Sequence, residues 1–138
     1  MLNIFEQEQY KEYCIRRLAR AWTAHKKIII CVDYDNTILA YNDFEKKICD
    51  LVVSTIKRAQ DFGIKLILYT CREGSDLVFA VEHCKQLGLH FDDINPQKPF
   101  QPQMSCKPYC NIMLDDKGGL LSALDILIGA IELYEQYD

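Results

Sequence analysis

Two pairs of acidic residues each come directly after a run of strongly apolar residues. The first pair is Asp33 and Asp35 in KIIICVDYDNT, and the second is Asp115 and Asp116 in NIMLDD. Four carboxylates brought together repel one another strongly unless a cation joins them. Hard oxygen ligands without a histidine favour Mg²⁺ over zinc. The two pairs therefore predict a magnesium site if the fold brings them together.

Two further polar residues could complete a site for a phosphate group. Thr70 ends the apolar run IKLILYT, and Lys107 comes shortly before the second acidic pair. The Thr70 hydroxyl and loop N–H groups could donate hydrogen bonds to phosphate oxygens, while Mg²⁺ and Lys107 would balance the phosphate charge. Arg72 follows Thr70 closely and could select a substrate anion.

Apolar runs and helical periodicities predict the elements that must position these residues. Strands are expected at 27–33, 64–70, 89–95 and 111–115. Helices are expected at 3–24, 43–62, 75–87 and 120–137. Strands alternating with helices predict an α/β domain with a mainly parallel sheet. Ligands bind such sheets beyond the carboxyl ends of the strands, which is where the acidic pairs and Thr70 lie.

The predicted helices carry their own start and stop signals. Asp43 and Ser75 are candidate N-cap residues for the second and third helices, and Gly63 and Gly88 follow the ends of these helices. Apolar spacing also predicts a buried face for each of the first three helices. The expected buried residues are Tyr10, Tyr13, Cys14, Leu18 and Trp22; Phe44, Ile48, Leu51, Val52, Thr55, Ala59 and Phe62; and Leu77, Val78, Val81, Cys84 and Leu87.

Length and composition describe one globular domain covering residues 1–138. The 138 residues are 49% hydrophobic and 26% charged, with a net charge of −4 and no Lys/Arg run longer than two. Long nucleic acid is therefore an unfavourable partner. No apolar run approaches the ~20 residues that span a bilayer, and the acidic first residues do not resemble a signal peptide. We expect a cytoplasmic protein without a membrane partner, whose seven scattered cysteines are mostly small core residues.

The polar residues, taken in order, resemble a known family. Asp33-Tyr-Asp35-Asn-Thr37, then Thr70, Lys107 and Asp115-Asp116, resemble the four motifs of the haloacid dehalogenase (HAD) superfamily of phosphohydrolases. The segments LYTCRE (68–73), FDDIN (91–95) and 107–119 are similar to a group of small, capless, mostly uncharacterised HAD proteins. The likeness covers about residues 28–120 and leaves an extra helix in residues 1–25 outside it. It implies a three-layer αβα Rossmann-like fold.

This resemblance also bears on whether a cap domain covers the site. HAD proteins normally insert a cap after the first motif or after the third strand. Here five residues separate Thr37 from Asp43, and the stretch from Asn95 to Cys106 is one loop. We therefore expect no cap domain and an open site, which suits a large substrate, although the proline-rich residues 96–102 could form a partial lid.

The resemblance implies a mechanism for phosphate ester hydrolysis. The Asp33 carboxylate would attack phosphorus to form an aspartyl-phosphate that water hydrolyses, and Asp35 would act as general acid and base. Side chains at i and i+2 of an extended segment face the same way, so both can reach one phosphoryl group. Mg²⁺ would be held by the Asp33 side chain, the Asp35 main-chain carbonyl, and Asp115 or Asp116. An aspartate at position 35 disfavours dehalogenase chemistry, and Asn36 stands where the family most often has glycine.

Other classes of protein share parts of this pattern. Receiver domains also use an acidic pair, a phosphorylated aspartate, a threonine and a lysine. They carry the acidic pair on the first strand and the acceptor on the third, whereas here the acceptor candidate comes first. A non-catalytic phosphate-binding or assembly module on the same fold is a further alternative. The sequence does not distinguish nucleotide, sugar phosphate, phosphoprotein and nucleic-acid end as substrates.

The last predicted helix is unusually apolar. Its polar positions form one stripe, consisting of Ser122, Asp125, Gly129, Glu132 and Gln136. A chain of this length can hide only one broad face of such a helix. We therefore expect a homo-oligomer, in the simplest case a dimer, with part of that apolar surface or of the N-terminal helix at the interface.

Overall fold

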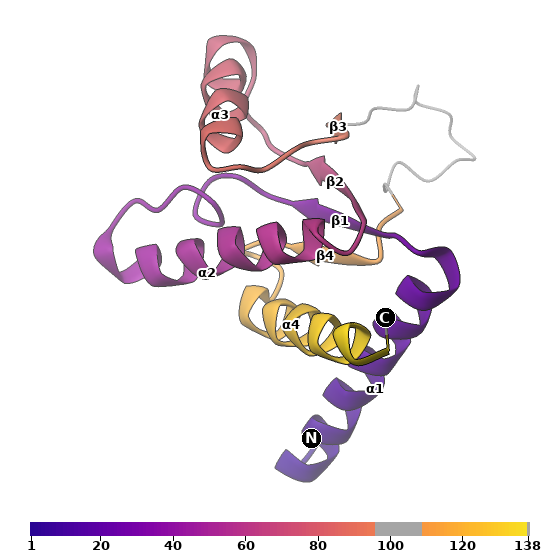
Figure 1. Cartoon of the computed structure of the whole chain (residues 1–138). Coiled ribbons are helices and arrows are strands. Elements are labelled where there is room, and N and C mark those ends of the chain that lie inside the picture. Colours follow the sequence, from indigo (N-terminus) through magenta and orange to yellow (C-terminus); the bar gives the residue numbers. More distant parts are fainter. Residues whose placement is uncertain (96–108, 138) are drawn as a thin grey trace, which may run out of the picture.

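The computed structural model describes residues 1–95 and 109–137 (Figure 1). All eight predicted elements are present. In chain order they are α1 (Ile4–His25), β1 (Ile28–Val32), α2 (Asp43–Gln60), β2 (Ile64–Leu68), α3 (Gly74–Gln86), β3 (Asp93–Ile94), β4 (Ile112–Leu114) and α4 (Leu120–Tyr137). Among the described residues, no helix combines the length and apolar character needed to cross a membrane.

The four strands form one parallel sheet in the order β3-β2-β1-β4. In its register Val32 of β1 lies opposite Leu68 of β2 on one side and Leu114 of β4 on the other. The carboxyl ends of these three strands are therefore level with one another. With helices flanking the sheet, the predicted α/β class and Rossmann-like architecture are confirmed.

Both faces of the central strands are buried. Ile30 and Val32 belong to a hydrophobic core to which all four helices contribute. Cys31 and Ile67, at the alternate positions, are also buried although they lie outside this cluster. Burial on both faces is typical of parallel strands and explains why these runs show no polar alternation.

Trp22 packs the second half of α1 against α4 and the turn between α2 and β2. Its ring is fully buried and stacks on Tyr134 of α4 with the centroids 5.0 Å apart. Its indole N–H donates to the carbonyl oxygens of Phe62 (3.2 Å) and Gly63 (3.0 Å). Part of the apolar surface of α4 that suggested an oligomer is thus covered by α1 of the same chain.

The structure corrects both predicted N-caps. Asn42 caps α2, because its backbone is extended and its side chain accepts a hydrogen bond from the Glu45 N–H at 2.8 Å. Asp43 is the first residue of that helix. Glu73 precedes α3 without a side-chain cap, and Ser75 lies inside the helix. An N-cap needs extended backbone angles as well as a suitable side chain, and sequence pattern does not report backbone angles.

The predicted buried faces were too wide. Phe44 is 92% exposed, and Leu51, Tyr10 and Tyr13 are exposed as well. On α3 the prediction was wrong at Val78, which is 61% exposed. Periodicity identifies an apolar stripe, but only the part of the stripe that meets another element becomes buried.

The loop that follows β1 is too short to carry a cap domain. Only five residues separate Thr37 from Asp43, so no domain is inserted there. The backbone N–H groups of Ile38 and Leu39 donate to the Tyr34 carbonyl oxygen at 2.8 and 3.0 Å, which makes the start of this loop a tight turn. β3 has only two residues, so the predicted strand 89–95 was too long. Lys107, Cys106 and the proline-rich stretch 96–102 lie outside the described residues.

Candidate active site

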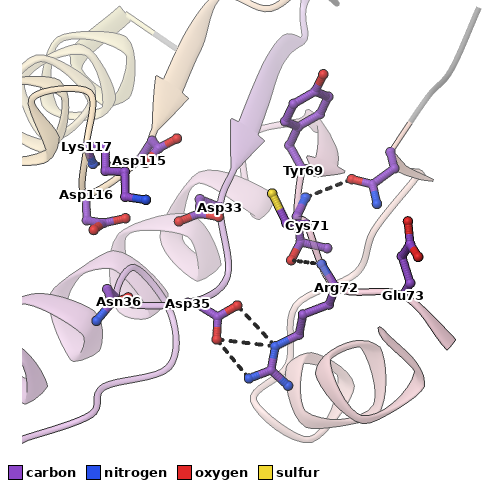
Figure 2. A pocket seen from close by; sticks show the side chains of 12 residues that line it. Asp33, Asp35, Asn36, Tyr69, Cys71, Arg72, Glu73, Asp115, Asp116 and Lys117 are labelled. Carbon is purple, nitrogen blue, oxygen red and sulfur yellow. Dashed lines mark hydrogen bonds and ion pairs between the residues drawn. The ribbon is translucent and has the colours of Figure 1, made fainter. Parts of the chain in front are cut away.

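Residues at the carboxyl ends of β1 and β4 bring the two acidic pairs together. Asp33 follows β1, and its backbone N–H donates to the Leu114 carbonyl oxygen of β4 at 2.9 Å. One carboxylate oxygen from each of Asp33, Asp115 and Asp116 lies within 4.8 Å of the other two. Figure 2 shows these side chains gathered at one side of a pocket. We call this group the acidic cluster.

Thr37 forms hydrogen bonds with one residue of each acidic pair, Asp33 and Asp116. Its side chain is fully buried. Its hydroxyl oxygen lies 3.3 Å from Asp33 Oδ2 and 3.4 Å from Asp116 Oδ1, and can donate to either carboxylate. The same oxygen accepts a hydrogen bond from the Asp116 backbone N–H at 3.1 Å. Thr37 therefore links Asp33, four positions before it, to Asp116, 79 positions after it.

The loop after β1 depends on Asn36. Its φ is +64°, in the left-handed region that asparagine adopts more readily than most residues. Its side-chain amide donates to both carboxylate oxygens of Glu45 at 2.9 Å. Asn36 thus supplies the left-handed turn after β1, and it also joins the loop to the first turn of α2.

Within the described residues, no ion pair joins a carboxylate of the acidic cluster to a basic side chain. Burial, a hydrogen bond with Asp116 and the charge of Asp115 together raise the pKa of Asp33 to about 6. A bound cation would reverse this shift, because it favours the ionised carboxylate. The donor set consists only of carboxylate oxygens, which fits a hard cation such as Mg²⁺ and does not suit zinc. The predicted ligands Asp33, Asp115 and Asp116 therefore fit the implied metal.

Asp35 lies in different surroundings. Its carboxylate accepts hydrogen bonds from Arg72 Nη2 at 2.8 Å and Arg72 Nε at 3.1 Å, and from the Tyr41 hydroxyl at 2.5 Å. The Arg72 contact lowers the pKa of Asp35 despite some burial, and Tyr41 adds to this effect. In Figure 2 the Asp35 side chain is directed at Arg72 rather than toward the acidic cluster. The metal contact expected through the Asp35 main-chain carbonyl stays a prediction.

Arg72 is held firmly by aromatic rings as well as by Asp35. Its guanidinium lies 4.8 Å from the centroid of the Tyr34 ring and 5.9 Å from that of Phe79. The buried Tyr34 hydroxyl pairs with His83 Nδ1 at 2.7 Å, which anchors that ring. Arg72 was expected to select a substrate anion, but in this state it neutralises Asp35. Sequence spacing carried no signal for this pairing.

A cavity of about 670 Å³ extends from the acidic cluster to Arg72. Thr70 lines it, as expected, with its N–H donating to the Asn95 side chain at 2.7 Å and its hydroxyl accepting from the Arg72 N–H at 3.2 Å. Lys117 also lines the cavity, a residue that the sequence analysis passed over. Its position directly after Asp116 was the one feature of the sequence that could have indicated a place in the site. The expected phosphate-binding Lys107 lies outside the described residues.

Comparison with known proteins adds support for the fold. No protein-family model and no curated protein matches the chain. A solved structure from Bacteroides thetaiotaomicron, described as a conserved protein coded by a locus, aligns with a TM-score of 0.55 and 28% sequence identity. The alignment covers 80% of this chain and 92% of that chain. Its description names no activity.

Proposed function

We propose that this protein is a Mg²⁺-dependent phosphatase that hydrolyses a phosphate monoester through an aspartyl-phosphate on Asp33. The observation that carries the proposal is the convergence of Asp33, Asp115 and Asp116 at the edge of an open cavity. The resemblance of the polar motifs to those of HAD phosphohydrolases supports the same reading. Bound Mg²⁺ would neutralise the acidic cluster and draw the phosphate oxygens toward Asp33.

In the first step the Asp33 carboxylate attacks phosphorus, and the bond from phosphorus to the leaving oxygen breaks. Thr37 orients Asp33 through their hydrogen bond. Asp35 supplies a proton to the leaving oxygen. In the second step Asp35 takes a proton from the water that attacks the phosphorus of the aspartyl-phosphate, which releases inorganic phosphate and restores Asp33.

Asp35 can donate a proton only if its contact with Arg72 is weakened. Arg72 holds Asp35 in its ionised form before substrate binds. An anionic phosphate that shares the guanidinium would weaken this contact and raise the affinity of Asp35 for a proton, which Asp35 would take from solvent before the leaving oxygen departs. Arg72 would then serve both Asp35 and the substrate, which agrees with the expectation that it recognises an anion. Thr70 and Lys117 line the cavity in positions to assist phosphate binding.

The substrate is a phosphate monoester whose organic part can extend out of the cavity. Among residues 1–95 and 109–137, no domain covers the loop between Thr37 and Asp43. Exposed Tyr69 lines the cavity, and exposed Tyr41 donates to Asp35, which also lines it. A sugar phosphate, a nucleotide, a phosphoprotein or the end of a nucleic acid all fit this description. A panel of such esters would identify the class.

The test is hydrolysis of p-nitrophenyl phosphate with Mg²⁺ and with EDTA. Activity is expected to disappear in EDTA and to return with excess Mg²⁺. Asp33→Asn should reduce turnover to background, and Asp115→Asn and Asp116→Asn should each raise the Mg²⁺ concentration needed for activity. Asp50→Asn, an exposed carboxylate on α2 paired with Lys46, is the matched control and should behave as wild type.

Three results would count against the proposal. Full turnover in EDTA would refute the metal site. Unchanged activity in both the Asp115 and Asp116 variants would show that the last motif is misplaced. Binding of Mg²⁺ and phosphate without turnover of any ester would favour the non-catalytic phosphate-binding module instead.

A further inference from the structure

The N-terminal half of α1 has no cover from the described residues. The buried residues of this helix are Cys14, Leu18, Ala19 and Trp22, so burial begins only at its midpoint. Figure 1 shows the first turns of α1 extending away from α4 and the sheet. On this free part Phe5 is 70% exposed and Tyr13 is 53% exposed, with Ile4 and Tyr10 exposed as well.

The uncovered half is nonetheless specified as helix. Asn3 and Glu6 form a capping box, in which the Asn3 side chain accepts from the Glu6 N–H at 2.8 Å and Glu6 accepts from the Asn3 N–H at 2.9 Å. Such a cap starts the helix at Ile4 and prevents the first turns from fraying. Apolar side chains are thus displayed on a regular surface, which is typical of a docking face.

The charges on α1 indicate what this surface fits. Its first half carries Glu6, Glu8 and Glu12 with one lysine, Lys11, and its second half carries Arg16, Arg17 and Arg20. Within the helix Glu8 pairs with Lys11 at 3.1 Å and Glu12 with Arg16 at 3.2 Å, which leaves the first half net acidic and the second half net basic. Parallel pairing of two such helices would place like charges together. Antiparallel pairing would place the acidic half of each helix against the basic half of the other, with the tyrosines of the free half between them.

We propose that two copies of this chain associate through the exposed face of α1, with the two helices antiparallel about a two-fold axis near Tyr13. A two-fold interface is self-complementary, as this charge pattern requires. The aliphatic stems of Arg16 and Arg20 would cover the partner's apolar side chains while their guanidinium groups meet its glutamates. The candidate active site lies at the carboxyl edge of the sheet, so this inference is independent of the proposed function.

The proposed pairing of two α1 helices is tested by reversing their charges and measuring the molecular mass by sedimentation equilibrium at micromolar concentration. Wild type is expected at twice the chain mass of 16.1 kDa. A basic variant carrying Glu8→Lys and Glu12→Lys, and an acidic variant carrying Arg16→Glu and Arg20→Glu, should each be monomeric. An equimolar mixture of the two should form a dimer, and the variant with all four changes should again dimerise by itself. Glu6 is left unchanged because it belongs to the cap.

Controls separate loss of pairing from loss of folding. A variant with Lys46→Glu and Asp50→Lys, which reverses an exposed ion pair on α2, should dimerise as wild type does. Circular dichroism of each variant reports helix content, and recovery of the dimer in the mixture shows that both partners are folded. A monomeric wild type would overturn the proposal. Dimers that persist in both the basic and the acidic variant would assign the interface to another face, and would overturn it equally.

Discussion

Asp33 and Asp35 are two positions apart, yet the fold gives their carboxylates opposite surroundings. Asp33 shares a partly buried space with Asp115 and Asp116, which raises its pKa to about 6. Asp35 pairs with Arg72 and Tyr41, and its pKa is lowered. A group that attacks phosphorus beside a cation and a group that moves a proton need different environments, and the two residues supply them.

Substitution of Asp35 tests this division of roles. Asp35→Asn leaves the nucleophile in place but removes the proton donor, an effect worth roughly 10²–10⁴-fold in rate. Alkyl phosphates, whose leaving groups need protonation, should lose the most activity. With p-nitrophenyl phosphate the first step should partly survive while hydrolysis of the aspartyl-phosphate slows, which gives a burst of nitrophenol in rapid-mixing experiments.

Mass spectrometry of the denatured Asp35→Asn protein should then detect a phosphoryl group on Asp33. Asp33→Asn provides the control, because it has no carboxylate to phosphorylate and should show no burst. Equal losses for alkyl and aryl esters, without trapped phosphoprotein, would show that Asp35 is not the general acid and base.

At the scale of elements, the turn between α2 and β2 depends on Gly63. Its φ is +96°, and a Cβ added there would lie 2.7 Å from the Lys26 carbonyl oxygen. This turn also accepts the Trp22 indole N–H, so it connects α1, α2 and β2. The glycine that was expected to end α2 is thus required by close backbone contact as well as by backbone angle.

Gly63→Ala should therefore destabilise the protein by more than backbone strain alone. A left-handed conformation costs a residue with a Cβ about 1–2 kcal/mol. The clash with backbone should add to this cost, since the Lys26 oxygen cannot move without shifting the end of α1. Gly74→Ala is the matched control, because its φ is +57° with nothing within 4 Å of an added Cβ. Urea unfolding should show the larger loss for Gly63→Ala, and equal losses would contradict the contact.

At the scale of the whole molecule, the sheet order places β1 between β2 and β4, so the candidate site forms only when these three strands pair. Asp33 directly follows β1, and Asp115 directly follows its neighbour β4. Folding therefore concentrates negative charge at one edge of the sheet, and a cation there should stabilise the entire fold.

This coupling predicts the pH dependence of stability in EDTA. The pKa of Asp33 is about 6 in the folded protein and about 3.9 in an unfolded chain, so between these values the folded state binds more protons. The Asp33 contribution to the free energy of unfolding should consequently fall as pH rises from about 4 to about 6. Asp33→Asn lacks this titration, so its stability relative to wild type should increase over the same range.

Thermal unfolding of the two proteins in EDTA measures the difference at each pH. Excess Mg²⁺ at pH 7 should raise the midpoint of wild type, by an amount equivalent to about 2.7 kcal/mol when its concentration is 100 times the dissociation constant. Asp33→Asn should respond less. A stability difference that does not change with pH would mean that Asp33 is solvated like an ordinary surface carboxylate.

Local patterns of the sequence determined the elements and their order. Apolar runs predicted β1 and β4 to within about two residues at each end, and the bounds of α4 agree with the structure. Such patterns succeed because burial on one or both faces requires apolar residues at regular spacing. The topology of alternating strands and helices then placed the acidic pairs and Thr70 at one edge of the sheet.

Only the tertiary structure decided how the four carboxylates divide. Asp33, Asp115 and Asp116 form a cluster, whereas Asp35 turns to Arg72, a residue 37 positions away. The same holds for Phe44, whose exposure depends on which neighbour meets its side of α2. Contacts of this kind depend on how close distant segments of the chain come in the folded protein. The identities and spacing of residues along the chain do not specify that distance.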